Sequence, residues 1–196
     1  WIHRNRLLHP IIEKSWQFFT ISISDKSNLS NICELKICDI AGFKAQLLGK
    51  LSAFKKAPFY DETIDTIEKI LIHNFKYLTD LNSFSLELLS TELNLKTEFL
   101  WQEDIIIDKR NIKHSGSWAL EIAKSLGAKE YINPCGGRYL FDKNEFLSEN
   151  ITLTFLSACL SEYDQGRKKF EPRLSIIDSI LWNGMEGTEK IIKSQI

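Results

Sequence analysis

The residues from Leu126 to Leu140 constrain the fold more than any other stretch, because they combine a helix end, a strand and a glycine-rich turn. Gly127 follows a segment with helical apolar spacing and suits the left-handed residue that closes a helix. Residues 130–132 are strand formers, and Pro134 is expected to end that strand because proline has no N–H for the ladder. The stretch therefore predicts a helix, a short strand and then a turn.

Two further strands are expected on either side of this stretch, at residues 97–101 and 151–156. A helix predicted at 117–126 lies between the first strand and the strand at 130–132. A short helix near 142–149 lies before the last strand. Parallel neighbours need crossover connections of this kind. We therefore expect an α/β fold in which a small, mostly parallel sheet holds all three strands and is flanked by helices.

The first half of the chain is expected to be mainly helical. β-Branched and aromatic residues predict two strands, at 16–23 and 32–37. Apolar residues at helical spacing then predict a run of helices that begins at Asp39, a good capping residue, and ends at Asn94. We expect this region, around residues 39–94, to be a helical insertion in the α/β fold.

A final helix is predicted over residues 174–182, closed by the Asn-Gly pair that follows it. Its apolar residues Ile177, Leu181 and Trp182 fall on one face. We expect these three side chains to be largely buried.

The bulk composition bounds the class of protein. The chain has 196 residues, 43% of them hydrophobic and 26% charged, which is ordinary for one soluble globular domain spanning residues 1–196. Its net charge of −1 disfavours a nucleic-acid partner. The four cysteines lack the spacing of a metal site and are expected to be free thiols in a reducing cytoplasm. No apolar run is long enough for a membrane-spanning helix.

The glycine pair Gly136-Gly137 is a candidate anion site. Glycines can adopt positive φ and expose successive backbone N–H groups, and Arg138 adds a fork of donors beside them. An ordinary turn explains the pair equally, because double glycines are common in turns. Cys135 is either an activated thiolate beside these amides or merely a small residue.

Two residues are candidates for moving a proton. Asp178 lies in an apolar helix, where an unpaired carboxylate is costly, so it is either a general base or a partner of Ser175 in a capping box. His114 lies in a polar loop over residues 102–114 and is either an acid–base group or a solvated histidine. At the start of the chain, Arg4 and Arg6 can hold one carboxylate or phosphate, or can simply be an exposed end.

Several of these stretches, read together, resemble the WbqC-like protein family, and the resemblance covers nearly the whole chain. The stretches that carry it are Trp1 to Arg6, Lys56 to Glu62, Leu126-Gly127-Ala128, Pro134 to Arg138, and Phe170 to Asp178 with Asn183-Gly184 beyond. The segment Tyr163-Asp164-Gln165 is similar to the Tyr-x-Gln element of that family. The resemblance implies a place in bacterial gene clusters for O-antigen and other surface polysaccharides, in which a glycine transferase role has been suggested for one member.

The sequence departs from the family pattern at two points. Family members usually carry further strands before the Arg-Asn-Arg element, so we expect these N-terminal strands to be missing from this chain. Where the family more often has proline or a small residue before the paired glycines, this chain has Cys135. The resemblance therefore gives no support to thiol catalysis.

The resemblance implies a transferase that modifies an amino sugar, by glycyl or other acyl transfer, in the synthesis of a surface-polysaccharide precursor. The alternative is a non-catalytic protein of the same pathway that binds a nucleotide-sugar or a partner. The partner expected in either case is a small molecule, a nucleotide-sugar or an acyl donor, in the bacterial cytoplasm. The sequence defines no cofactor, no metal and no oligomeric state. The residues expected to handle a proton are Asp178 and His114, and those expected to bind substrate are Arg4, Asn5, Arg6, Gly136, Gly137, Arg138, Tyr163 and Gln165.

Overall fold

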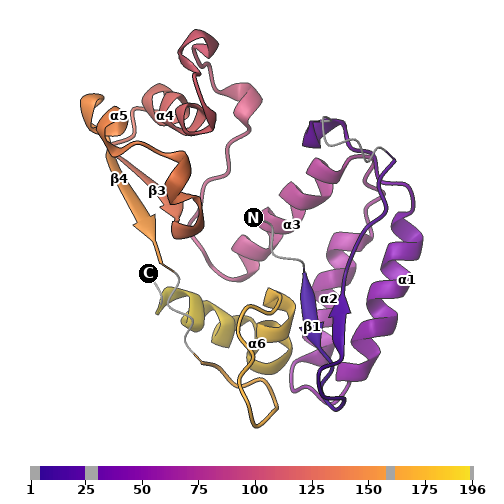
Figure 1. Ribbon diagram of the computed structural model, residues 1–196. Coiled ribbons are helices and arrows are strands. Elements are labelled where there is room, and N and C mark those ends of the chain that lie inside the picture. Colours follow the sequence, from indigo (N-terminus) through magenta and orange to yellow (C-terminus); the bar gives the residue numbers. More distant parts are fainter. Residues whose placement is uncertain (1–4, 25–30, 158–161, 195–196) are drawn as a thin grey trace. The chain divides into compact units, whose positions relative to one another are not determined.

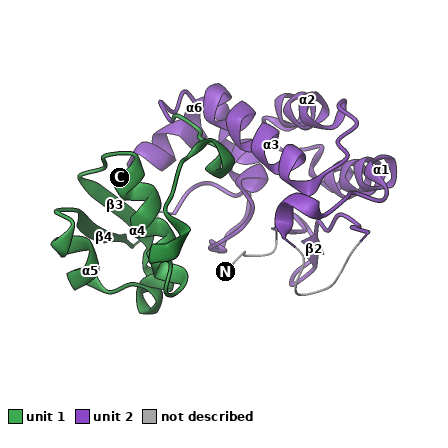
Figure 2. Cartoon of the chain, turned by 90° about the horizontal axis from the view of Figure 1, so that it is seen from above, with its two compact units in different colours: residues 1, 98–159 green, residues 2–97, 160–196 purple. Residues whose placement is uncertain are grey.

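A computed structural model of the chain describes residues 5–24, 31–157 and 162–194 (Figure 1). Its internal contacts divide these residues into two compact units (Figure 2). Unit 1 contains the described residues from 98 onward up to 157, and unit 2 contains those before 98 and after 161. The expectation that residues 1–196 form a single domain stays a prediction.

Unit 2 begins with a small antiparallel hairpin. Strand β1 (Arg6–Leu8) pairs with β2 (Trp16–Phe18), with Leu7 opposite Gln17. The strand expected over 16–23 therefore stops early. The N–H of Phe19 still bonds to the carbonyl of Asn5, at 3.0 Å, and pairing any further along β2 would require the residues before Asn5, which lie outside the described part of the chain.

The strand expected over 32–37 is wrong. Residues Ile32–Glu34 form one 3₁₀ turn, in which the N–H of Leu35 bonds back to the carbonyl of Ile32. Only isolated bridges follow, from Lys36 to Tyr77 and from Ile37 to Ile23. The side chains of this segment alternate poorly between apolar and polar, so neither face of a strand would be buried.

Three helices follow and confirm the helical region around 39–94. They are α1 (Ile40–Leu51), α2 (Tyr60–Leu71) and α3 (Leu78–Glu92). Asp39 caps α1, as predicted, by accepting a 2.7 Å hydrogen bond from the N–H of Gly42. Asn94, just beyond α3, has a φ of 51°, which ends the helix in the left-handed region. The buried apolar side chains of this region form one core, which includes Leu47, Leu51, Phe54, Ile67, Ile70 and Leu81.

Helix α6 (Ile176–Lys193) packs on the same core but is bent in the middle. Gly184 has φ 67° and ψ −178°, a conformation that breaks a helix and that only glycine adopts readily. The hydroxyls of Ser179 and Thr188 lie 3.0 Å apart, although residues nine apart in a straight helix are separated by about 13 Å along the axis. The predicted Asn-Gly stop is thus a bend, after which the helix resumes.

The apolar face predicted for the first half of α6 is partly confirmed. Leu181 is fully buried, and Ile177 and Trp182 are half-buried against the same core. The N–H of Phe59, just before α2, bonds to the carbonyl of Leu181 at 3.2 Å. Helices α2 and α6 are therefore joined by backbone bonding as well as by packing.

Unit 1 confirms the α/β fold. Strands β3 (Glu130–Pro134) and β4 (Thr152–Leu156) pair in parallel, with Ile132 opposite Thr154. Helix α5 (Lys143–Ser148) is the connection between them, and α4 (Ser115–Ser125) precedes β3. Gly127 closes α4 with a φ of 62°, as predicted. The core of the unit is formed by Leu120, Ala123, Phe146, Ile151 and Leu153.

The third strand expected in this sheet, at 97–101, is wrong. These residues form no strand and lead into a 3₁₀ turn at Gln102–Asp104. Phe99, Leu100 and Trp101 are 39%, 54% and 43% exposed, so neither face of the segment is buried. Apolar strand formers do not make a strand without a partner edge and a surface to cover. The predicted crossover by the helix at 117–126 is consequently absent as well.

Throughout the described ranges, every helix is too short or too polar to span a bilayer.

Candidate functional site

His114 joins the beginning of α4 to α5. Its Nδ1 atom accepts a hydrogen bond from the N–H of Gly116 at 3.2 Å, so the side chain caps the helix. Its Nε2 atom lies 3.0 Å from a carboxylate oxygen of Glu145. Because Nδ1 accepts, Nε2 carries the ring hydrogen and donates it to Glu145. His114 is therefore an ordered residue and not a freely solvated one.

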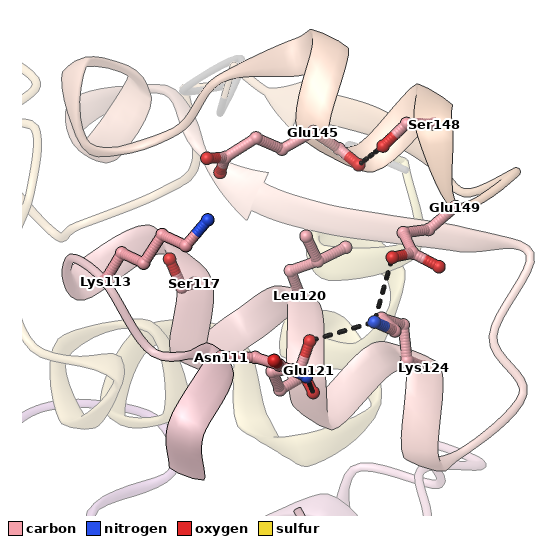
Figure 3. A pocket seen from close by; sticks show the side chains of 9 residues that line it. All are labelled: Asn111, Lys113, Ser117, Leu120, Glu121, Lys124, Glu145, Ser148 and Glu149. Atoms are coloured by element: carbon pink, nitrogen blue, oxygen red, sulfur yellow. Dashed lines mark hydrogen bonds and ion pairs between the residues drawn. The ribbon is translucent and has the colours of Figure 1, made fainter. Parts of the chain in front are cut away.

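A polar pocket of about 260 Å³ lies between α4 and α5 (Figure 3). Three carboxylates and two ammonium groups line it, which gives the lining a net negative charge. The full lining is Asn111, Lys113, Ser117, Leu120, Glu121, Lys124, Glu145, Ser148 and Glu149. His114 holds Glu145 at the edge of this pocket.

The charges at one end of the pocket are satisfied by one another. Lys124 donates to Glu121 at 3.0 Å and to Glu149 at 2.9 Å (Figure 3). These two hydrogen bonds raise the pKa of Lys124 above its usual value, with the bond to Glu149 contributing most. Glu121 is buried and also accepts a 3.2 Å hydrogen bond from the amide of Asn111. This end is a fixed network.

Glu145 is differently placed. Its only side-chain partner among the described residues is His114, so its carboxylate keeps lone pairs that are free to accept from a bound molecule. No lysine or arginine of the described chain forms an ion pair with it. Glu145 is thus the carboxylate of the pocket that is available to an amine or a hydroxyl.

The glycine pair does not form the expected concavity of amides. Cys135–Leu140 is a 3₁₀ helix, and neither Gly136 nor Gly137 has a positive φ. In a 3₁₀ helix the N–H groups run along the axis instead of converging on one point. A Cβ at position 137 would lie 2.6 Å from the side-chain nitrogen of Asn133, so a larger residue there would displace the end of that side chain. The positive-φ geometry expected of this pair is therefore absent, and substrate binding by Gly136 and Gly137 stays a prediction.

Arg138 is exposed, and its guanidinium lies 5.0 Å from the centre of the Phe155 ring. That position leaves its donors open to solvent, so its role as an anion ligand stays a prediction without the support of the glycines. Cys135 is an exposed free thiol.

Asp178 is fully buried in unit 2. One oxygen accepts from the Tyr163 hydroxyl at 3.1 Å, and the other lies 3.4 Å from Nη2 of Arg167. Burial raises the pKa of Asp178 to about 6, although the charge of Arg167 and the bond from Tyr163 oppose the shift. Burial also raises the pKa of Tyr163. The carboxylate of Asp178 is thus enclosed by groups of the chain itself.

The predicted capping box is confirmed for Ser175 but not for Asp178. Ser175 caps α6 by accepting from the N–H of Ile177, but the N–H of Ser175 bonds to the carbonyl of Arg6 and leaves nothing for Asp178 to cap. Asp178 therefore does not cap its helix, and its role as a general base stays a prediction. It joins α6 to the loop that carries Tyr163 and Arg167.

Gln165 and Arg6 hold the same loop. Gln165 is 2% exposed, and its amide bonds to both backbone polar groups of Glu171, at 2.8 and 2.9 Å. Arg6 stacks on Trp16, with 4.1 Å from its guanidinium to the ring centre, and lies 3.7 Å from the carboxylate of Glu171. Asn5 contributes its carbonyl to the hairpin.

The side chains of Arg6, Tyr163 and Gln165 contact other residues of the chain. Substrate binding by these three residues and by Asn5 stays a prediction. Arg4 lies outside the described residues.

A family model described as the WbqC-like protein family matches residues 1–190. The chain belongs to this family. No curated protein and no solved structure matches it. Membership of the WbqC-like family links the chain to the gene clusters of O-antigen and other surface polysaccharides.

Several residues of the pocket in this WbqC-like chain were not predicted as site residues. The spacing of two pairs carried the signal: Glu121 and Lys124 are three apart on α4, and Glu145 and Glu149 are four apart around α5, so each pair shares a face. What the sequence could not show is that the two faces meet. Within the described ranges, no three His, Cys, Asp or Glu side chains are grouped to hold a metal ion.

Proposed function

We propose that this chain is a transferase that modifies an amino sugar, by glycyl or other acyl transfer, during the synthesis of a surface-polysaccharide precursor. The observation that carries the proposal is the pocket between α4 and α5, in which Glu145 is held by His114 and faces open space. Family membership supports a place in surface-polysaccharide synthesis. The carboxylates of the pocket support an amine as the group that is bound.

The lining suits the ammonium form of an amino sugar. Three carboxylates meet two lysines there, and the single charge of Lys124 is shared by Glu121 and Glu149. Glu145 is left as the carboxylate that pairs with a bound cation. A charge-assisted hydrogen bond of this kind contributes about 1.5–3 kcal/mol.

The volume favours a single sugar ring. Pockets for drug-sized ligands measure roughly 300–1,000 Å³, and this pocket, at about 260 Å³, lies just below that range. The amino sugar is therefore the part that enters, and any nucleotide attached to it stays outside.

The chemistry required of the chain is proton removal. The amine must lose a proton before its nitrogen attacks the acyl carbon, forming the amide C–N bond as the bond from the acyl carbon to the donor's leaving group breaks. Glu145 accepts that proton, and His114 orients the carboxylate through its Nε2–H. In this scheme His114 does not take the proton itself but orients Glu145, which does.

The proposal is tested with nucleotide-linked amino sugars and a panel of acyl donors, with the product read by mass. We expect acylated product from the unaltered chain and at least a hundredfold lower rate from Glu145→Gln, because general-base catalysis contributes roughly 10²–10⁴-fold. Glu103→Gln is the matched control, since Glu103 is an exposed carboxylate in the same unit that does not line the pocket. An equal loss in both variants would contradict the role of Glu145.

The same experiment separates the transferase from a binding protein. Binding that depends on Glu145, with no product from any donor, would favour the non-catalytic alternative.

A further inference from the structure

Two polar groups of the pocket have no partner. Ser117 as a residue is only 5% exposed, but its hydroxyl oxygen opens on the pocket and makes no hydrogen bond to any residue that the structure describes. The ammonium of Lys113 points into the pocket, and no interaction joins it to another pocket residue (Figure 3). The other ammonium of the lining, Lys124, is paired with Glu121 and Glu149, whereas Glu145 has only His114 as its side-chain partner among the described residues.

Within the described part of the chain, the hydroxyl of Ser117 and the ammonium of Lys113 are therefore the two hydrogen-bond donors of the lining that are free to receive a ligand. A hydroxyl that opens on a pocket and has no protein partner is met there by water or by a ligand. Here the hydroxyl and the free ammonium belong to one short stretch, four residues apart, at the beginning of α4. Both groups donate hydrogen bonds, and the first turn of a helix favours a negative charge.

We propose that Lys113 and Ser117 form an oxyanion subsite that receives a phosphate or carboxylate group attached to the sugar bound in the pocket. The sugar then carries both an amine, which Glu145 receives, and an acidic group, which this subsite receives. The amine half rests on the proposed function, and the oxyanion half rests only on the two unpaired donors.

The test is calorimetric titration of the full chain with four probes. Glucosamine carries only the amine, and glucose 1-phosphate carries only the oxyanion. Glucosamine 1-phosphate carries both, and 2-amino-2-deoxyglucuronic acid replaces the phosphate by a carboxylate. The variants are Lys113→Met and Ser117→Ala, with Lys129→Met as the control, since Lys129 is an exposed lysine of the same unit outside the pocket.

We expect glucosamine 1-phosphate to bind about tenfold or more tightly than glucosamine, which is the scale of one charged hydrogen bond. Lys113→Met should remove most of that advantage, Ser117→Ala should remove a smaller part, and Lys129→Met should remove none. Glucosamine should bind Lys129→Met as it binds the unaltered chain, and should bind Lys113→Met and Ser117→Ala no more weakly, because neither side chain accepts from the amine and loss of the Lys113 charge favours a cation. The affinities of glucosamine 1-phosphate and 2-amino-2-deoxyglucuronic acid are then compared. The tighter of the two shows whether the oxyanion is a phosphate or a carboxylate.

The failures are distinguishable. Equal affinity for glucosamine and both acidic amino sugars, unchanged in Lys113→Met, would overturn the subsite and leave the amine pocket standing. Glucose 1-phosphate binding as tightly as glucosamine 1-phosphate, with the dependence on Lys113 retained, would support the subsite and contradict the proposed function. Absence of binding by all four probes would overturn both.

Discussion

The six-membered ring of Trp182 occupies the space that a side chain at Gly166 would need. A Cβ atom built at Gly166 would lie 2.1 Å from two carbons of that ring and 2.6 Å from a third. Gly166 also has a φ of 62°, in the left-handed region. The loop that holds Tyr163, Gln165 and Arg167 is thus fitted to α6 through a residue that has no side chain.

Replacing Gly166 by alanine should therefore destabilise the chain by about 2–4 kcal/mol, the sum of a left-handed alanine and an overpacked contact. Denaturant unfolding measures the change. Gly136→Ala is the control, because its Cβ would meet nothing within 4 Å and its φ is not positive. Equal unfolding midpoints for the two variants would show that the loop around Gly166 accommodates a methyl group at little cost.

Asp178 should make stability depend on pH. Its folded pKa of about 6 lies above the ordinary 3.8, so the folded chain binds this proton more tightly than the unfolded chain does. The cost of the buried charge is fully present above pH 6 and is relieved as the pH falls through 6 toward 3.8. Between pH 7 and pH 5 the free energy of unfolding should rise by about 1–1.5 kcal/mol relative to Asp178→Asn.

Unfolding curves of both chains across this pH range check the prediction. It concerns the difference in slope, so a uniform loss of stability in Asp178→Asn does not affect it. Parallel curves would mean that Asp178 keeps an ordinary pKa when folded.

His114 should have separable roles in stability and in activity. Asparagine is a good capping residue, so His114→Asn should keep α4 capped and change stability little. His114→Ala should lose about 1 kcal/mol of stability with the cap. Both variants lose the hydrogen bond to Glu145, and the transferase rate should fall roughly tenfold or more in each. A full rate in His114→Asn would show that Glu145 does not need the histidine.

The network around Lys124 should be revealed by a double variant. Lys124→Met leaves the buried carboxylate of Glu121 without its ammonium partner and should cost about 1–2 kcal/mol, less than a fully buried pair because the Lys124 side chain is 30% exposed. Adding Glu121→Gln removes the unpaired charge and should restore most of the loss. Thermal or denaturant unfolding of the single and double variants measures the coupling, which would be absent if the three groups acted independently.

The parts of the fold that local chemistry determines were predictable from sequence. Asp39, Asn94 and Gly127 end or begin helices as expected, because capping depends on a few consecutive residues. The parallel pair at 130–134 and 152–156 was predictable from the helix between its strands. The stretch 97–101 has equally good strand formers but no edge to pair with, and an edge is not a local property.

The candidate site was harder to predict for the same reason. His114 could be proposed from its loop, but its partner Glu145 is 31 residues away and becomes visible only when α4 packs against α5. Gly136 and Gly137 gave a misleading signal, because glycine permits positive φ without requiring it. The close approach of the Asn133 side chain to Gly137 depends on the fold, and the sequence does not show it.

The bend at Gly184 also bears on how α6 opens. The N–H of Met185, just after the bend, donates to Glu62 of α2 at 3.2 Å, and a side chain at Gly184 would lie 2.8 Å from the ring of Phe59. The Ser179–Thr188 pair closes the inner side of the bend. The end of a broken helix ordinarily unfolds independently of the rest. In α6, however, hydrogen bonds close to the break join the helix to α2 and join its two halves to each other. Amide hydrogens just before and just after Gly184 should therefore exchange with solvent together, as one cooperative unit.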